Sequence, residues 1–273
     1  FQQPDGRIKH LPGWNFTDWV DNWESWRTGV GQPGQDGSSC VLDLQLLIAY
    51  QLAADLERVL GSNDFAQIYT DRAAALETAI SQSYWDEERG LYADRSEREA
   101  FSQHANALAI IAGLARDEQA KSIAGKIESD PTLAPASIYF KYYTHRAMIL
   151  AGLGDHYLSW LDKWRENIRM GLTTWGETSD VDGTRSDCHA WGSSPNIQRY
   201  RSFLGLDSES HAITSIKIKP HPGALTDIGG QTPPPTGTLR VHFIVPEHDL
   251  ETTLRLTKRT TGTVVSHGDD YSR

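Results

Sequence analysis

Residues 36–61 read DGSSCVLDLQLLIAYQLAADLERVLG, and this stretch decides the fold of the first half of the chain. Apolar residues recur in it every four positions, which is the spacing of one stripe along an α-helix. They are Leu44, Ile48, Leu52, Leu56 and Leu60. Because apolar residues also lie on the other faces, we predict a deeply buried helix that ends at Gly61.

The helical pattern then repeats in antiparallel pairs. The first helix pairs with a second over residues 64–84, and two more pairs are predicted over residues 101–127 and 137–170. A further helix follows Pro195 and ends at Gly205. Such pairs, of roughly 35 to 40 residues each, form either an α-solenoid or a closed helical toroid. An irregular segment rich in Trp, Asp or Gly follows each pair, which favours a toroid whose loops build a site.

The pattern changes after residue 206. Short segments follow that are rich in β-branched residues or alternate between apolar and polar residues, with Gly- and Pro-rich turns such as GGQTPPPTG between them. These segments are SIKIK (215–219), TLRVHFI (238–244), TLRL (253–256) and GTVVSH (262–267). We therefore predict a mainly α-helical domain over residues 1–205 and a small antiparallel β domain over residues 206–273.

The bulk composition excludes several classes of function. There are 36 acidic residues against 26 basic ones, for a net charge of -10, and no basic cluster, so a nucleic-acid partner is not expected. No apolar run reaches about 18 residues, so no membrane span is expected either. Cys40 and Cys188 are the only cysteines, no spacing resembles a zinc site, and we expect neither a metal nor a cofactor. The compartment stays open, because no signal-peptide pattern is present.

Aromatic residues point to carbohydrate. The chain has nine Trp and ten Tyr, and aromatic faces pack well against the C–H surfaces of sugars. The segment LPGWNFTDWVDNWESW (residues 11–26) holds four of the Trp, and it forms either a pocket wall or a loop folded over the core. Asp18 lies between Phe16 and Trp19, so we expect a partly desolvated carboxyl that hydrogen-bonds a sugar hydroxyl or has a raised pKa.

A second segment, GLTTWGETSDVDGTRSDCHAW (residues 171–191), is predicted to be an ordered loop. A glycosidase needs two carboxyl groups that flank the scissile bond. Glu177 is a candidate for one of them, because it follows Trp175, a possible sugar platform, in a loop that returns to His189 and Trp191. The alternative is a solvated loop carboxylate. His104 and His145 fall in helical segments, where structural roles are expected.

Over nearly its whole length the sequence resembles the α-L-rhamnosidases of glycoside hydrolase family 78. The matching segments are GWNFTDWV, DGSSCVLDLQLLIAYQLAADL, YWDEERGLYAD, GLTTWGET, SDCHAWGSSPNI, LGLDSESHAITSIKIKPHPGAL and PTGTLRVHF. The resemblance implies an (α/α)6 toroid followed by a C-terminal β-sandwich. It also implies an inverting hydrolysis that releases L-rhamnose from an oligosaccharide, polysaccharide or other glycoside.

The resemblance also implies roles for individual residues. The family's general base closes a Thr-Thr-x-x-Glu segment, which falls on Glu177, and this residue would take a proton from the attacking water. His189 and Trp191 would lie at the sugar, and Trp14 and Trp19 would form pocket walls. The family's general acid lies in an arginine- and acid-rich segment upstream of GWNFTDW, and no such segment occurs in these 273 residues.

We therefore expect the chain to be the C-terminal part of a larger enzyme, with the upstream portion either on the same polypeptide or on a separate chain. The predicted helices are also too few to close a toroid of twelve. The isolated chain would then be nearly inactive, because general-acid catalysis contributes typically about 10²- to 10⁴-fold. If the chain holds its own acid, Asp18 and then Glu24 are the candidates.

Two other classes of function remain open. One is another helical-toroid glycosidase or a polysaccharide lyase, although a lyase should bring Arg, His and Tyr together where this sequence offers Trp and acids. The other is a non-catalytic carbohydrate-binding portion. Binding of L-rhamnose without hydrolysis, after the upstream part is restored, would favour it.

Overall fold

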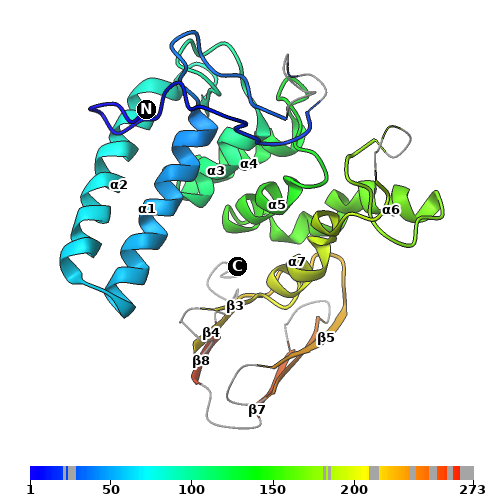
Figure 1. Ribbon diagram of the computed structural model, residues 1–273. Coiled ribbons are helices and arrows are strands. Elements are labelled where there is room, and N and C mark those ends of the chain that lie inside the picture. Colours follow the sequence, from blue (N-terminus) through cyan, green and yellow to red (C-terminus); the bar gives the residue numbers. More distant parts are fainter. Residues whose placement is uncertain are drawn as a thin grey trace. The chain divides into compact units, whose positions relative to one another are not determined.

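The computed structural model describes residues 1–20, 23, 29–180, 183, 186–208, 215–233, 238–245, 251–256 and 261–264 (Figure 1). The chain divides into two compact units. The first unit comprises Phe1–Ala151 and Gly176–Cys188, and the second comprises Gly152–Trp175 and His189–Arg273. The predicted domain boundary between residues 205 and 206 stays a prediction.

The first unit is built from antiparallel helices, as the sequence predicts. They are α1 (Cys40–Leu60), α2 (Asn63–Tyr84), α3 (Gln103–Ile111), α4 (Asp117–Ser129) and α5 (Lys141–Leu150). A strand pair, β1 (Trp85–Asp86) and β2 (Leu91–Tyr92), follows α2. α1 packs on α2 and α3, and α3 packs on α4 and α5 (Figure 1). Serine side chains fix where helices begin: Ser39 Oγ accepts the Leu42 N–H (3.4 Å) at the start of α1, and Ser62 Oγ accepts the Asp64 N–H (3.2 Å) at the start of α2.

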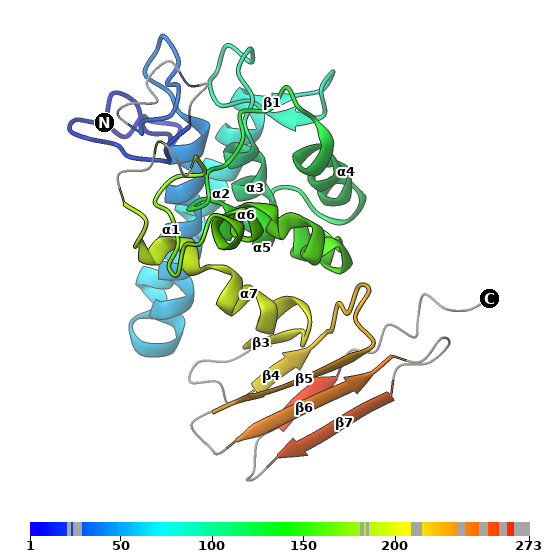
Figure 2. The same ribbon diagram turned by 90° about the vertical axis from the view of Figure 1, so that its right-hand side faces the viewer.

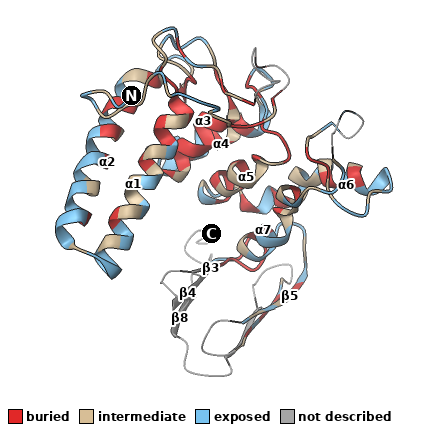
Figure 3. Cartoon of the chain, in the orientation of Figure 1, coloured by how far each residue is buried: buried red, intermediate tan, exposed pale blue. Residues whose placement is uncertain are grey.

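The predicted deep burial of α1 holds only for its first half. Leu44 and Leu47 are completely buried, whereas Leu52, Leu56 and Leu60 are 64%, 53% and 79% exposed. Figure 3 shows buried residues at one end of α1 and exposed residues at the other. The short helix α3 reaches α1 as far as Gln51, whose Nε2 donates to the Ala112 carbonyl (2.9 Å). Beyond Gln51, α3 no longer packs on α1, so the apolar side chains that follow at four-residue spacing are exposed to solvent. The four-residue spacing correctly predicted a helix, but the prediction that the whole helix is deeply buried was wrong.

This difference along one helix predicts different costs for the same substitution. Leu47→Ala should lower the free energy of unfolding by about 2 to 5 kcal/mol, because it leaves a cavity in the core. Leu56→Ala should change it by less than about 1 kcal/mol, because the side chain is half exposed and Ala is the better helix former. Urea denaturation of both variants measures this. Equal losses would contradict the burial described for α1.

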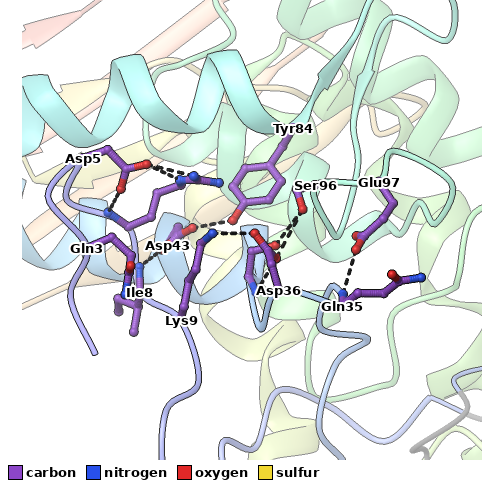
Figure 4. A network of polar contacts seen from close by, with 12 residues as sticks. Gln3, Asp5, Ile8, Lys9, Gln35, Asp36, Asp43, Tyr84, Ser96 and Glu97 are labelled. Carbon is purple, nitrogen blue, oxygen red and sulfur yellow. Dashed lines mark hydrogen bonds and ion pairs between the residues drawn. The ribbon is translucent and has the colours of Figure 1, made fainter.

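Two buried carboxyl groups tie the loops of this unit to its helices. Asp43, on α1, accepts the Tyr84 hydroxyl (2.6 Å) and the Ile8 N–H (2.7 Å), so it joins the N-terminal loop to both helices (Figure 4). Asp94 accepts the Ser102 hydroxyl (2.5 Å), and its carbonyl accepts the Cys40 N–H (2.9 Å). Burial disfavours the charged form and raises the pKa of each carboxyl, from 3.8 to about 6.

The two raised pKa values predict that stability falls as the pH rises. In the unfolded chain these carboxyls lose their protons near pH 3.8, and in the folded chain only near pH 6, so the folded state binds more protons between these values. The free energy of unfolding should therefore decrease from about pH 4 to pH 6, by on the order of 2 kcal/mol per group, and stay low above.

Denaturation midpoints at pH 4.5 and pH 7 measure this effect, and Asp43→Asn should reduce the difference between them. Asp36 titrates below this window, because hydrogen bonds from Lys9 and Ser38 outweigh its partial burial and lower its pKa. A chain that is equally stable at both pH values would contradict the account.

The second unit carries the strands β3 to β8 and several short helices. The helical elements are η2 (Gly154–Leu161, a 3₁₀ helix), α6 (Asp162–Arg169), η3 (Ala190–Ser193, also 3₁₀) and α7 (Pro195–Ser202). The strands are β3 (Leu206–Ser208), β4 (Ser215–Ile218), β5 (Asp227–Thr232), β6 (Leu239–Ile244), β7 (Glu251–Leu256) and β8 (Thr261–Val264). They form the sheets β3-β4-β8 and β5-β6-β7, which lie as two layers (Figures 1 and 2). β6 alternates as predicted, with Leu239, Val241 and Phe243 buried.

Three features of this unit differ from the sequence-based expectation. β4 and β8 pair in parallel, so the β part is not wholly antiparallel. β5 was missed, because Gly229 and Gly230 were interpreted as part of a turn. A Cβ at Gly230 would lie 2.4 Å from Leu204 Cδ1, so a larger residue at this point of the strand would displace the Leu204 side chain. α7 ends at Ser202, three residues before the predicted stop at Gly205. Gly205 has φ of 61°, and the Lys219 backbone lies 1.9 Å from where its Cβ would be, so a glycine is needed there.

Candidate active site

Asp18 is completely buried, and its carboxylate holds three parts of the first unit together. Oδ2 accepts from His104 Nε2 on α3 (2.7 Å) and from the Ser137 N–H (2.8 Å). Oδ1 accepts from the Ser137 hydroxyl and from the Trp19 N–H (2.9 Å). A carboxylate offers about four lone pairs, and here all four are used.

This geometry replaces the predicted role of Asp18. A carboxylate with no exposed surface and no free lone pair cannot accept a hydrogen bond from a sugar hydroxyl or serve as the reserve general acid. Asp18 is desolvated, as the sequence suggested, but its hydrogen-bond partners are protein groups. Glu24, the second reserve acid, lies outside the described residues, as do Asp21 and Trp26.

His104 is the main partner of Asp18. Its ring is fully buried between Trp23 (ring centroids 4.7 Å apart) and Phe140 (4.3 Å). Nδ1 has no hydrogen-bond partner among the described residues, and Nε2 faces a carboxylate, so Nε2 carries the proton. The expected structural role of His104 is therefore supported. His145 is also buried, and burial lowers its pKa well below the usual value, which keeps it neutral.

The aromatic residues around Asp18 form a partly exposed cluster. Trp14 is 66% exposed and lies near Phe16 (5.4 Å between ring centroids) and Trp19 (6.3 Å). Phe16 in turn contacts Trp19 (5.1 Å). Gly29 has φ of 66°, and a Cβ there would lie 2.4 Å from the Phe16 ring, so the backbone packs directly on the cluster. An exposed Trp on a fixed base is a surface on which a sugar can stack.

Glu177 lies in the loop Gly176–Cys188 of the first unit and is only 4% exposed. Its backbone N–H donates to the Ser186 carbonyl (2.8 Å), which closes the loop on itself. The Thr178 hydroxyl donates to the Asp180 carbonyl (2.9 Å), and Ser179 Oγ accepts the Ile138 N–H (2.9 Å). Residues 177–180 and 186 of this loop are thus held by hydrogen bonds, and Glu177 is not the solvated carboxylate of the alternative interpretation.

Trp175, His189 and Trp191 belong to the second unit, and within it they lie together. The His189 N–H donates to the Trp175 carbonyl (2.9 Å), and the His189 and Trp191 rings are 4.2 Å apart. All three side chains are partly exposed. Trp164 Nε1 donates to the Gly192 carbonyl (2.6 Å), which anchors the turn that follows Trp191.

Neither a metal cluster nor a membrane helix is found in the parts of the chain that the structure describes. No group of three or more His, Cys, Asp or Glu side chains in these residues could hold an ion. None of the described helices is both long and apolar enough to cross a bilayer. A hollow of about 330 Å³ lies between α1 and α2, but its lining includes none of the predicted site residues.

Antiparallel helical hairpins followed by two small sheets fit the fold class of an incomplete helical toroid with an appended β part. Residues 2–137 match the model of the bacterial α-L-rhamnosidase six-hairpin glycosidase domain. This segment belongs to that family, which confirms the resemblance seen in the sequence. No curated protein matches the chain significantly.

Solved structures share the fold over most of the chain. The family 78 rhamnosidase of Bacillus sp. GL1 covers 97% of the chain with a TM-score of 0.82 and 23% identity. The α-L-rhamnosidase of Aspergillus terreus covers 95% (TM-score 0.71, 19% identity). That of Streptomyces avermitilis, solved with L-rhamnose, covers 82% (TM-score 0.67, 20% identity). The chain spans only 29%, 32% and 23% of these three proteins, so its helical part is an incomplete toroid.

The buried position of Asp18 predicts a large cost for its removal. Asp18→Ala leaves the Ser137 N–H and hydroxyl and His104 Nε2 buried without an acceptor, so the free energy of unfolding should fall by about 3 kcal/mol or more. Asp55→Ala is the matched control, because Asp55 is 61% exposed and pairs with Arg58 on the surface. It should cost less than about 1 kcal/mol. Thermal denaturation of both variants measures the difference, and similar losses would contradict the structural role of Asp18.

Proposed function

We propose that this chain is part of an inverting α-L-rhamnosidase in which Glu177 is the general base. The observation that carries the proposal is a nearly buried glutamate in a closed loop, at the position where the family's Thr-Thr-x-x-Glu segment falls. The family match over residues 2–137 and the shared fold support the same class of reaction.

The chemistry requires Glu177 to act as a carboxylate. In an inverting hydrolysis, its oxygen takes a proton from water while that water attacks the anomeric carbon. A second carboxylic acid, about 6.5 to 9.5 Å away, gives a proton to the leaving oxygen on the other face of the sugar. The burial of Glu177 keeps bulk water away, so the proton transfer would take place in a site of low dielectric.

We assign the general acid to a segment upstream of this chain. Asp18 is excluded by its four hydrogen bonds to protein groups. The chain also spans less than a third of the Bacillus relative, which leaves room for the acid in the remainder of a longer polypeptide. The isolated chain would then bind sugar weakly and turn it over very slowly.

The substrate in this proposal is a terminal α-L-rhamnosyl group. Trp14 and Trp19 offer aromatic faces that a sugar ring can stack on, and Trp14 is exposed enough to do so without rearrangement. We assign His189 and Trp191 to sugar contact as well, from the resemblance, and Trp175 because it lies two residues before Glu177 in the sequence. A methyl group at C6 makes rhamnose more apolar than most hexoses, which suits aromatic walls.

Hydrolysis of an aryl α-L-rhamnoside tests the proposal. The assay compares the chain alone with a longer polypeptide that contains the upstream segment, and includes Glu177→Gln in both. We expect turnover only in the longer form, β-L-rhamnose as the first product by NMR, and a kcat lowered about 10²- to 10⁴-fold by Glu177→Gln.

Glu118→Gln is the matched control, because Glu118 is an exposed residue in the first turn of α4. It should leave kcat unchanged. Retained activity in Glu177→Gln would refute the assignment of the base. Rapid turnover by the chain alone would refute the upstream acid. Binding of L-rhamnose without turnover by the longer form would favour a non-catalytic carbohydrate-binding protein.

A further inference from the structure

The loop that carries Glu177 is anchored to the helices by the backbone of residue 138. The Ile138 N–H donates to Ser179 Oγ (2.9 Å), two residues beyond Glu177. Ile138 is completely buried, so its N–H would be costly to leave without a partner. Ser179 is partly exposed, and its hydroxyl meets this need from the loop side.

Ser137, the residue before Ile138, is held by the Asp18 carboxylate. Both the N–H and the hydroxyl of Ser137 donate to the Asp18 carboxylate. The same hydroxyl oxygen accepts the Tyr139 N–H (3.2 Å), and the Ser137 carbonyl accepts the Lys141 N–H (3.0 Å) at the start of α5. The N–H groups of residues 137, 138 and 139 therefore all have assigned acceptors, and the backbone between α4 and α5 has little freedom to turn.

Asp18 itself is held by α3. His104 Nε2 donates to it (2.7 Å), and the His104 ring is wedged between Trp23 and Phe140. Hydrogen bonds thus link His104 to Asp18 and Asp18 to Ser137, the peptide bond links Ser137 to Ile138, and a further hydrogen bond links the Ile138 N–H to Ser179. All of these residues belong to the first unit.

We propose that Asp18 and Ser179 are positioning residues for Glu177. Asp18 orients the backbone at residues 137 and 138, and the Ile138 N–H then holds Ser179, so that the loop presents the Glu177 carboxylate in one place. The role of Glu177 as base rests on the proposed function above. The positioning of its loop does not, and it can be tested separately.

Ser179→Ala is the test variant, because it removes the acceptor of the Ile138 N–H without opening the core. Ser179→Thr keeps a hydroxyl at the same position and should restore the contact. Ser129→Ala is the control, because the Ser129 hydroxyl is exposed and bonds only its own helix, at the Gly125 carbonyl (2.7 Å).

Amide hydrogen exchange of the 273-residue chain, read by mass spectrometry, measures the anchor. In Ser179→Ala, peptides covering residues 138 and 176–188 should exchange roughly 3- to 10-fold faster, as expected for the loss of one hydrogen bond. Ser179→Thr and Ser129→Ala should match the parent chain, with unchanged melting temperatures. Asp18→Asn should speed exchange in the same two segments, because the amide nitrogen replaces one of the two carboxylate oxygens and one of the two Ser137 donors then loses its acceptor.

Unchanged exchange in Ser179→Ala, or failure of Ser179→Thr to restore protection, would overturn the proposal. Where the longer polypeptide turns over rhamnosides, Ser179→Ala should lower kcat more than it changes KM, and Ser179→Thr should recover it. Absence of turnover in every form would defeat the proposed function and leave the exchange result standing.

Discussion

The arrangement of the first unit depends on one buried carboxylate. Asp18 accepts hydrogen bonds from α3, from the segment before α5 and from its own loop, and it has no contact with solvent. Removing a carboxylate from water is expensive, and only a full set of donors offsets that cost. The protein provides this set from residues 86 and 119 positions further along the chain. The site that we assign to Glu177 is built on this anchor.

Buried carboxyl groups also join loops to helices elsewhere in the N-terminal half of the chain. Asp43 and Asp94 are also buried, and each joins a loop to a helix through hydroxyl or backbone donors. These two carboxyls have pKa values raised by burial, so they lower stability near neutral pH. What they provide is a fixed position for the loops that they join to the helices. Precise loops are what a sugar-binding site needs.

Local patterns predicted much of this structure, and long-range contacts account for what they missed. The four-residue stripe of α1 and the alternation of β6 are properties of short segments, so helix and strand were visible in the sequence. The exposure of Leu52, Leu56 and Leu60 depends on where α3 ends, and the stripe contains no information about that. Asp18 looked like a ligand-binding acid between aromatic residues, but its donors come from distant segments that its neighbours in sequence do not reveal.

A crystal structure of the longer polypeptide with L-rhamnose bound would test the central claim most directly. The account predicts a Glu177 carboxylate oxygen about 3 Å from the water that faces the anomeric carbon, with Asp18 still bonded to His104 and Ser137 and out of contact with the sugar. A sugar that hydrogen-bonds Asp18, or a Glu177 side chain directed away from the anomeric carbon, would contradict it.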